Sequence, residues 1–204
     1  MSHQYFEDNQ DLAHQRETFS FELLGHQLQL TTDAGVFSRE RVDYGSVVLL
    51  NAVAPFLPSG QPFKLLDLGC GYGPIGLSIA KAYPQAVVTL VDVNQRALDL
   101  AQENATANQV TDQVNIFASN GYQAITAQDY DFILTNPPIR AGKTVVQRLL
   151  SESIQYLKPQ GQFFAVMQKK QGAPSALKLL QSVYDQAEIV KRDKGYYILQ
   201  GLNL

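Results

Sequence analysis

The sequence predicts an α/β fold, Rossmann-like, in which a mostly parallel sheet carries helices on both faces. From Phe63 onward, short apolar runs alternate with segments of helical periodicity. A glycine-rich turn follows the first apolar run directly, and the next run ends in an acid about 20 residues beyond the glycines. These three observations are typical of a doubly wound sheet, in which loops at the carboxyl ends of the strands form the functional site.

The central stretch runs from Phe63 to Gly76 and reads FKLLDLGCGYGPIG. An apolar run carries Asp67 to the end of a buried strand, and the glycines that follow occupy alternate positions: Gly69, Gly71 and Gly73. Because glycine has no Cβ atom, the backbone can turn tightly here and come into contact with a ligand. A helix that begins near Pro74 points its free N–H groups at the same place. A plain tight turn would also use glycine, but it would not explain the preceding Asp or the acidic end of the next strand.

Length and composition set limits on the class of protein. The 204 residues suit one main domain, expected over 55–204, with a small extension over 1–54 packed on it. Apolar runs stay well short of the roughly 20 residues that cross a bilayer, and the first ten residues do not resemble a secretory signal. A single cysteine, Cys70, excludes an internal disulfide and fits a cytoplasmic protein. The net charge of −3 argues against a protein that coats nucleic acid by bulk charge.

All three histidines, His3, His14 and His26, precede the predicted core. A Ser/His/Asp triad or a histidine metal cluster at the glycine loop is therefore not expected, and we predict no metal site.

The first part of the chain predicts a small cover for the main sheet. Residues 1–16 are polar without a clear period and are expected to form a poorly ordered or loosely helical lead. Two β-like runs, 19–24 and 27–31, flank a two-residue turn at Gly25-His26 and predict a hairpin. A loop with an exposed Phe37 follows, and then a helix over 44–53. We expect this piece to pack as a lid on the main sheet, where it either covers an edge or gates a substrate.

Two later strand ends carry polar side chains suited to a nucleoside. Asp92 ends the second strand, where its carboxylate can accept hydrogen bonds from both ribose hydroxyls or can cap the helix predicted over 96–108. Asn120 follows the third strand, VNIFAS. Its side-chain carbonyl can orient an adenine amino group, or the residue can simply shape an Asn-Gly turn.

The fourth strand runs into Asn136, Pro137 and Pro138, where two prolines stop the sheet ladder and stiffen the backbone. An exocyclic amine or amide nitrogen is a poor nucleophile, since its lone pair is delocalised. If the Asn136 side-chain oxygen and the Pro137 carbonyl each accept one N–H, the nitrogen is held with its lone pair facing an electrophilic methyl group, as in S-adenosyl-L-methionine. The alternative is a rigid turn that merely ends the strand.

The remaining elements complete the alternating pattern. We expect a helix over 144–161 that serves only the core, a fifth strand over 162–167, a helix over 175–184, and a final antiparallel pair joined at Lys194-Gly195.

A nicotinamide enzyme is the competing interpretation, because residues 71–76 also fit the dinucleotide pattern G-x-G-x-x-G. That pattern alone is weak. The chain has no Tyr followed four residues later by Lys, and the Asn-Pro-Pro sequence has no evident role in hydride transfer.

These motifs carry a family resemblance. In their order and spacing, DLGCGYGPIG, VDVN, SNGY and NPPIRAGK resemble the class I S-adenosylmethionine-dependent methyltransferases. More narrowly, they resemble the methyltransferase small domain family, typified by ribosomal RNA small-subunit guanine-N2 methyltransferases. The stretches GVFSRERVDYGS and QKKQGA also look like that family, and the resemblance extends over nearly the whole chain from about Phe19.

The resemblance implies a seven-stranded sheet whose last strand is antiparallel. It implies that Asp67 and the glycine backbone hold the methionine part of the cofactor, Asp92 the ribose and Asn120 the adenine, with Asn136 at both cofactor and target amine. The catalytic group would be Asn136, Pro137 and Pro138. This sequence departs from the family at Asn120, where Asp is frequent, and at Ile139, where an aromatic residue commonly stacks on the target base.

An RNA substrate is expected from local positive charge despite the acidic total. Six cations lie at strand ends or loops on the expected ligand side: Arg39, Arg41, Arg140, Lys143, Lys169 and Lys170. The residues expected to contact the substrate are Phe37, Ile139, Arg140, Lys143 and Lys169. The leading hypothesis is methylation of the N2 amine of a guanine in small-subunit ribosomal RNA by a monomer or homodimer. The alternatives are methylation of a protein glutamine amide and a cofactor-binding RNA chaperone without catalysis.

Overall fold

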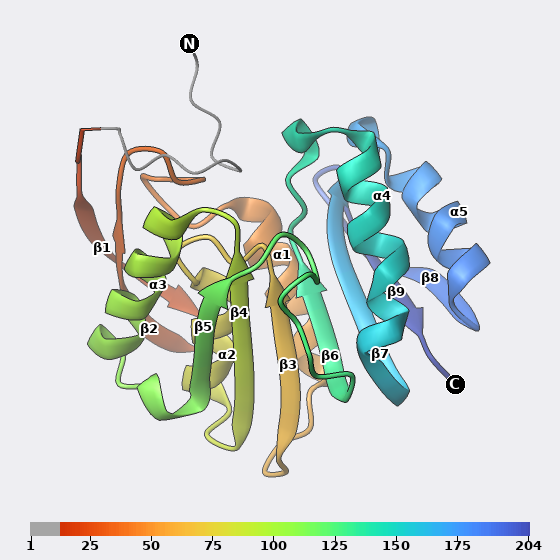
Figure 1. Ribbon diagram of the computed structural model, residues 1–204, viewed down its shortest axis with the longest axis horizontal. Helices are drawn as coiled ribbons and strands as arrows, with labels where there is room; N and C mark the ends of the chain where they lie inside the picture. Colours follow the sequence, from red (N-terminus) through yellow and green to blue (C-terminus); the bar gives the residue numbers. More distant parts are fainter. Residues whose placement is uncertain (1–12) are drawn as a thin grey trace.

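The computed structural model describes residues 13–204, so most of the lead expected over 1–16, including His3, lies outside the described residues. Within the described part of the chain, seven strands form one sheet in the order β5-β4-β3-β6-β7-β9-β8, and two more form a separate hairpin (Figure 1). The strands of the large sheet are β3 (Phe63–Leu68), β4 (Ala86–Asp92), β5 (Val114–Ala118), β6 (Tyr130–Thr135), β7 (Leu157–Gln168), β8 (Gln186–Asp193) and β9 (Tyr196–Leu202).

The strand directions confirm the predicted sheet. β3 pairs in parallel with β4 and β6, β4 with β5, and β6 with β7, whereas β9 is antiparallel to both β7 and β8. The chain moves outward from β3 to β5 and then returns to the other side of β3 at β6. Because the strand order reverses there, the loops that follow β3 and β6 diverge and leave a crevice at the carboxyl edge of the sheet.

Helices cover both faces of the sheet. One apolar core joins one face to α1 (Tyr44–Val53), α2 (Pro74–Ala82) and α3 (Gln95–Ala107), and a second core joins the other face to α4 (Lys143–Glu152) and α5 (Ala173–Val183). Strand β6 shows the alternation, since Phe132 and Leu134 belong to the first core and Ile133 to the second. Burial on both faces explains the nearly continuous apolar runs of the central strands.

The N-terminal hairpin consists of β1 (Glu17–Leu23) and β2 (His26–Thr32), and its turn lies one residue earlier than predicted. Leu24 and Gly25 form the turn with φ of 52° and 77°, and His26 already pairs with Leu23. Positive φ at both central residues is the geometry of a type I′ turn, whose twist matches that of the strands. The register then buries Leu28 on the inner face of the hairpin.

Within the predicted cover, the hairpin packs on α2 and α3, whereas α1 packs on β7 and β9 of the main sheet. Asn104 in α3 and Asn108, the C-cap of that helix, bind the outer edge of β2. Asn104 accepts the N–H of Thr31 at 2.7 Å and donates to its carbonyl at 3.0 Å, while Asn108 does the same to Gln29 at 3.0 and 2.8 Å. These side chains replace a neighbouring strand, so the edge of the hairpin is satisfied without joining the sheet.

The second half of the predicted helix over 144–161 is not α-helical. Helix α4 ends at Glu152, a short 3₁₀ turn follows, and β7 begins at Leu157, well before the predicted Gln162. Over residues 13–204 the 3₁₀ turns are η1 (Ala54–Phe56), η2 (Thr111–Gln113), η3 (Ile139–Ala141), η4 (Ser153–Tyr156) and η5 (Lys169–Gln171). The division at 54/55 stays a prediction, and the first core contains residues from both sides of it. In the described range, every helix is too short or too polar to cross a bilayer.

Candidate active site

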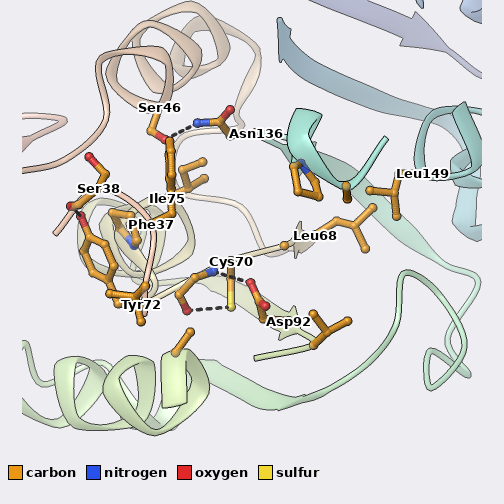
Figure 2. A pocket seen from close by; sticks show the side chains of 18 of the residues that line it. Phe37, Ser38, Ser46, Leu68, Cys70, Tyr72, Ile75, Asp92, Asn136 and Leu149 are labelled. Carbon is orange, nitrogen blue, oxygen red and sulfur yellow. Dashed lines mark hydrogen bonds between the residues drawn. The ribbon is translucent and has the colours of Figure 1, made fainter. Parts of the chain in front are cut away.

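A cavity of about 500 Å³ opens at the carboxyl ends of β3, β4, β5 and β6 (Figure 2). Its walls come from the glycine loop, the ends of the neighbouring strands, the loop after the hairpin and the start of α1. Such a volume is typical of small-molecule and cofactor sites. The predicted site residues that line it are Phe37, Gly69, Gly71, Asp92, Asn120, Asn136 and Pro138. The structure therefore places the glycine loop and the Asn-Pro-Pro segment in one cavity.

The glycine loop forms a cradle for a ligand. Gly69 and Gly71 have φ of 76° and 56°, and a Cβ atom built on either would meet nothing within 4 Å. The N–H groups of Gly69 and Cys70 both donate to the Val91 carbonyl, which fixes the turn against β4. Gly73 has another function: it precedes α2 with φ of 93°, a Cβ there would lie 2.8 Å from Leu77, and the residue does not line the cavity.

Asp92 lies at the cavity wall and does not cap α3. One carboxylate oxygen accepts the N–H of Gly71 at 2.8 Å and the other accepts that of Asn94 at 2.9 Å. Asn94 is the N-cap of α3, with a side chain that accepts from Ala97. Burial raises the pKa of Asp92 above its usual value. Each carboxylate oxygen retains acceptor capacity, so the ribose assignment is chemically consistent and stays a prediction.

Asp67 does not line the cavity, and its predicted contact with the methionine part of the cofactor stays a prediction. Its side chain is fully buried beneath the loop, where Oδ2 accepts the N–H of Gly76 at 2.8 Å and Oδ1 has no hydrogen-bond partner among the described residues. Burial, and to a smaller extent the charge of Asp92, raises the pKa of Asp67 to about 7. Asp67 thus supports the first turn of α2 from inside, and the backbone of the glycine loop faces the cavity instead.

Helix α4 contributes to the site, contrary to the prediction that this helix serves only the core. Val145 and Leu149 line the cavity, and Arg148 donates to the side-chain carbonyl of Asn120 at 2.8 Å. The Asn120 side-chain oxygen, which was predicted to bind the adenine amino group, therefore already accepts a hydrogen bond from the Arg148 guanidinium. Arg148 is not one of the apolar positions that predicted this helix, and the sequence offered no sign of its contact with Asn120.

Asn136 extends from the end of β6 into the region where the glycine loop meets α1. Its Nδ2 atom donates to Ser46 Oγ at 3.0 Å (Figure 2). The same atom donates to Asp43 Oδ2 at 2.9 Å. Pro138 lines the cavity, whereas Pro137 is buried and is not part of the lining. Asp43 and Ser46 were not among the predicted site residues, although both lie in the stretch GVFSRERVDYGS, which resembles the family.

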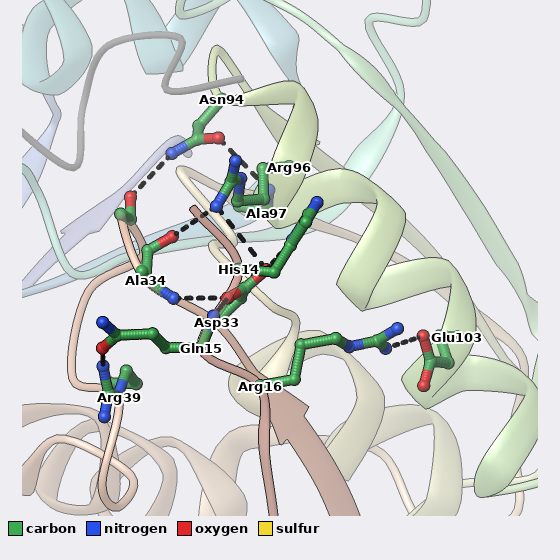
Figure 3. A network of polar contacts seen from close by, with 11 residues as sticks. His14, Gln15, Arg16, Asp33, Ala34, Arg39, Asn94, Arg96, Ala97 and Glu103 are labelled. Carbon is green, nitrogen blue, oxygen red and sulfur yellow. Dashed lines mark hydrogen bonds and ion pairs between the residues drawn. The ribbon is translucent and has the colours of Figure 1, made fainter. Parts of the chain in front are cut away.

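The loop after β2 closes one side of the cavity with Val36, Phe37 and Ser38. A polar network at the start of α3 holds this loop (Figure 3). Two side chains of this network donate to carbonyls of the loop. Arg96 donates to the Ala34 carbonyl at 3.2 Å, and Asn94 donates to the Gly35 carbonyl at 3.0 Å.

The buried Asp33 stands at the centre of this network, 3.6 Å from Arg96 and 2.5 Å from His14. Burial alone would raise its pKa, but hydrogen bonds from the His14 side chain and from the backbone of Gln15 and Ala34 lower it below the usual value. The loop is thus anchored through a charged carboxylate, whichever of its two predicted roles it has.

Of the five residues predicted to contact the substrate, Phe37 lines the main cavity and the other four do not. Ile139 and Lys143 line a second cavity of about 400 Å³ between α4 and α5, and Arg140 and Lys169 line neither. Arg39 is engaged with Glu17 at 2.5 Å and Gln15 at 2.7 Å, which removes it from the set available to phosphates. The other five predicted cations are exposed: Arg41, Arg140, Lys143, Lys169 and Lys170.

Three features surround this one cavity: the glycine cradle after β3, the acid at the end of β4 and the Asn-Pro-Pro segment after β6. Together they define an S-adenosylmethionine-dependent methyltransferase. The residues fit that cofactor, since Gly69 and Gly71 leave open space for it and Asp92 and Asn120 offer polar groups farther along the same wall. The chain belongs to the methyltransferase small domain family, whose model matches residues 27–200.

Individual relatives agree with this assignment. The chain is 42% identical over 202 residues to "Uncharacterized protein YbxB" of Bacillus subtilis, with 98% of each chain covered. It is also 42% identical to "Ribosomal RNA small subunit methyltransferase C" of Hahella chejuensis over 66% of this chain and 38% of that protein. A solved structure described as the T. thermophilus 16S rRNA N2 G1207 methyltransferase (RsmC) with AdoMet and guanosine matches with a TM-score of 0.83 and 28% identity. That match covers 93% of this chain and 51% of the other, so the chain spans about half or less of these two rRNA methyltransferases.

Proposed function

We propose that this methyltransferase modifies the exocyclic N2 amine of a guanine in small-subunit ribosomal RNA. The observation that carries the proposal is the placement of Asn136 in the same cavity as the glycine cradle. The solved relative described with AdoMet and guanosine supports the choice of a guanine, and the relatives named small-subunit methyltransferases support the choice of RNA.

The bound cofactor supplies a methyl group on a positively charged sulfur. The side chain of Asn136 and the carbonyl of Pro137 each accept one N–H of the target amine, so the nitrogen lone pair is directed along a single line. Holding the two reactants in this geometry supplies most of the rate enhancement. The amine loses its proton to water only as its new bond forms, and we assign no residue of the chain as an obligatory general base.

Phe37 is the aromatic residue we assign to the target base. Ile139, at the position where the family commonly has an aromatic residue, faces the second cavity. Phe37 lines the main cavity and is 40% exposed. A partly exposed ring at a cavity mouth is suited to contact a base that has been turned out of an RNA strand.

The test is transfer of tritium from labelled cofactor to small ribosomal subunits that lack the modification, followed by digestion to nucleosides. We expect label in N2-methylguanosine. Asn136→Ala should reduce transfer to a trace, because the amide oxygen serves the target amine in this mechanism.

Other outcomes identify the alternatives. Label found only in protein would contradict the proposal and favour a glutamine amide, whose NH2 group fits the same two acceptors. No transfer to any acceptor, together with an RNA phenotype that Asn136→Ala leaves unchanged, would favour the chaperone. We place the enzyme in the cytoplasm as a monomer or homodimer as part of this proposal.

A further inference from the structure

The amide of Asn136 is held by two side chains from a distant part of the chain. Asp43 precedes α1 and Ser46 lies in its first turn, and both line the main cavity. Asn136 Nδ2 donates to Asp43 Oδ2 at 2.9 Å and to Ser46 Oγ at 3.0 Å, so both protons of its NH2 group are used. No described residue donates to Asn136 Oδ1 in the structure.

The chemistry of Asp43 fixes which end of the amide faces it. An ionised carboxylate only accepts hydrogen bonds, so the NH2 end of Asn136 must point toward Asp43 and the carbonyl end must point away. A side-chain amide without such a neighbour can rotate by half a turn and exchange donor for acceptor at little cost. With the donor in the place of the acceptor, Asn136 would repel the N–H groups of a target amine.

The segment Asp43-Tyr44-Gly45-Ser46 is suited to this task at three of its four positions. Asp43 Oδ2 also accepts the N–H of Ser46 at 3.2 Å, so one oxygen both caps α1 and binds Asn136. A Cβ atom on Gly45 would lie 2.8 Å from that same oxygen and 2.9 Å from the Tyr196 ring. Glycine therefore leaves the space that the carboxylate needs, and Ser46 supplies the second acceptor.

We infer that Asp43 and Ser46 are positioning residues, which orient the Asn136 amide so that its carbonyl oxygen is presented to the target amine. The inference deepens the proposed function and rests on it for the identity of the amine. It assigns neither residue a contact with the reacting atoms.

The first test uses Ser46→Ala and Asp43→Ser. Serine is also a favourable N-cap, so Asp43→Ser retains the start of α1 while withdrawing the acceptor from Asn136. We expect each variant to lower kcat about tenfold or more, the cost of losing one hydrogen bond to a group that must be aligned, and to leave KM for the cofactor within about twofold. The matched control is Ser78→Ala, a buried serine in α2 whose hydroxyl bonds the Ile75 carbonyl, and it should retain kcat. Unchanged kcat in both test variants would overturn the inference.

A double-mutant cycle shows whether these residues act through Asn136. In an Asn136→Ala background, where transfer is measured over long incubations, Ser46→Ala and Asp43→Ser should cause no further loss. Full additivity would overturn the inference.

Asp43→Asn separates orientation from proton transfer. An amide oxygen in place of Oδ2 can accept from both Asn136 and Ser46, so we expect most of the activity to remain with the same pH profile. A fall to the level of Asn136→Ala with a changed pH profile would identify Asp43 as a base and overturn the inference.

The side-chain amide resonance of Asn136 supplies a measurement that does not depend on the substrate. It is assigned by its loss in Asn136→Ala, and the exposed Asn115 serves as the reference. We expect its protons to exchange with solvent more slowly than those of Asn115, and faster in Ser46→Ala and Asp43→Ser. Exchange as fast as in Asn115 would overturn the inference. If exchange behaves as expected but the wild type methylates no RNA, the proposed function fails and the inference survives for another amine.

Discussion

Two asparagines at the cavity are oriented by opposite charges. The carboxylate of Asp43 binds the NH2 end of Asn136, whereas the guanidinium of Arg148 binds the oxygen of Asn120. Since a guanidinium only donates and a carboxylate only accepts, each neighbour determines what its amide offers to the cavity. Asn136 offers its carbonyl, and Asn120 offers its NH2 group together with one remaining lone pair on its oxygen.

This arrangement predicts the effect of Asn120→Asp. A carboxylate at position 120 would accept from Arg148 and from an adenine amino group, and charge-assisted hydrogen bonds are stronger than neutral ones. We expect cofactor binding to tighten by about 0.5 to 1.5 kcal/mol in calorimetry. Asn115→Asp, an exposed change on β5, provides the control for added charge. Unchanged or weaker binding in Asn120→Asp alone would argue that adenine lies elsewhere.

The buried carboxyl of Asp67 predicts a specific pH dependence of stability. Its pKa of about 7 in the folded protein lies above the ordinary value of 3.8, so the folded state binds this proton more tightly than the unfolded state does. The stability that Asp67 contributes is therefore complete below the ordinary pKa and is lost as pH rises toward about 7. Asp67→Asn cannot ionise and should escape this loss.

Urea unfolding of the wild type and of Asp67→Asn should be compared at about pH 5 and about pH 8. We expect the free energy of unfolding of the variant, relative to the wild type, to be higher at the upper pH by a few kcal/mol, since each pKa unit is worth about 1.4 kcal/mol. Parallel pH curves for the two proteins would show that Asp67 keeps an ordinary pKa.

At the scale of elements, α3 holds the hairpin and the glycine loop together through one buried side chain. Besides its two bonds to Thr31, Asn104 donates to the Tyr72 carbonyl at 3.0 Å. Asn104→Ala would leave these backbone groups without partners in a fully buried place. We expect a loss of about 2 to 4 kcal/mol in the free energy of unfolding, since each buried unsatisfied group costs about 1 to 3 kcal/mol.

The exposed Gln102→Ala on the same helix is the matched control and should unfold like the wild type. If the two substitutions have equal effects, the contacts with β2 contribute little and the hairpin is held by its apolar face alone.

Elements whose ends are set by local chemistry were predictable from the sequence. The predicted helix over 44–53 coincides with α1, which Asp43 caps, and the helix predicted to begin near Pro74 is α2. The early start of β7 was not predictable, because the helical apolar spacing continues through Leu157 while pairing with β6 draws that residue into the sheet. The docking of the hairpin on α3 depends on Asn104 and Asn108, which in sequence look like ordinary polar positions of an amphipathic helix.

The same distinction applies to the site. Gly69, Gly71, Asp92, Asn120, Asn136 and Pro138 were located from strand ends alone, because parallel strands bring their carboxyl ends to one edge. Asp67 precedes the loop in sequence, but strand alternation turns its side chain inward beneath α2. The partners of the two asparagines come from α1 and α4, and only the packing of those helices over the sheet brings them near.

For the whole molecule, a net charge of −3 means that affinity for RNA must come from a local group of cations. Lys143, Lys169 and Lys170 are exposed at the starts of α4 and η5, near the carboxyl edge of the sheet where the cavity opens. Lys64 and Lys158 lie at the opposite, amino edge and pair with Asp129 and Asp131. Variants of the two sets of lysines therefore separate the effect of the total charge from the effect of where that charge lies on the sheet.

We expect Lys169→Gln combined with Lys170→Gln to raise KM for RNA and to leave cofactor affinity unchanged. If both lysines contact phosphates, the slope of log affinity against log salt should fall by about 0.7 to 0.9 for each contact removed. Lys64→Gln combined with Lys158→Gln removes the same charge from the other edge. It should alter neither KM for RNA nor cofactor affinity, because that edge lies away from the cavity. The loss of these exposed ion pairs should also cost little stability. Equal changes in the two double variants would mean that RNA responds to the total charge of the protein and not to this edge. A selective change at 169 and 170 would place the RNA backbone beside the end of β7, next to the cavity that contains Asn136.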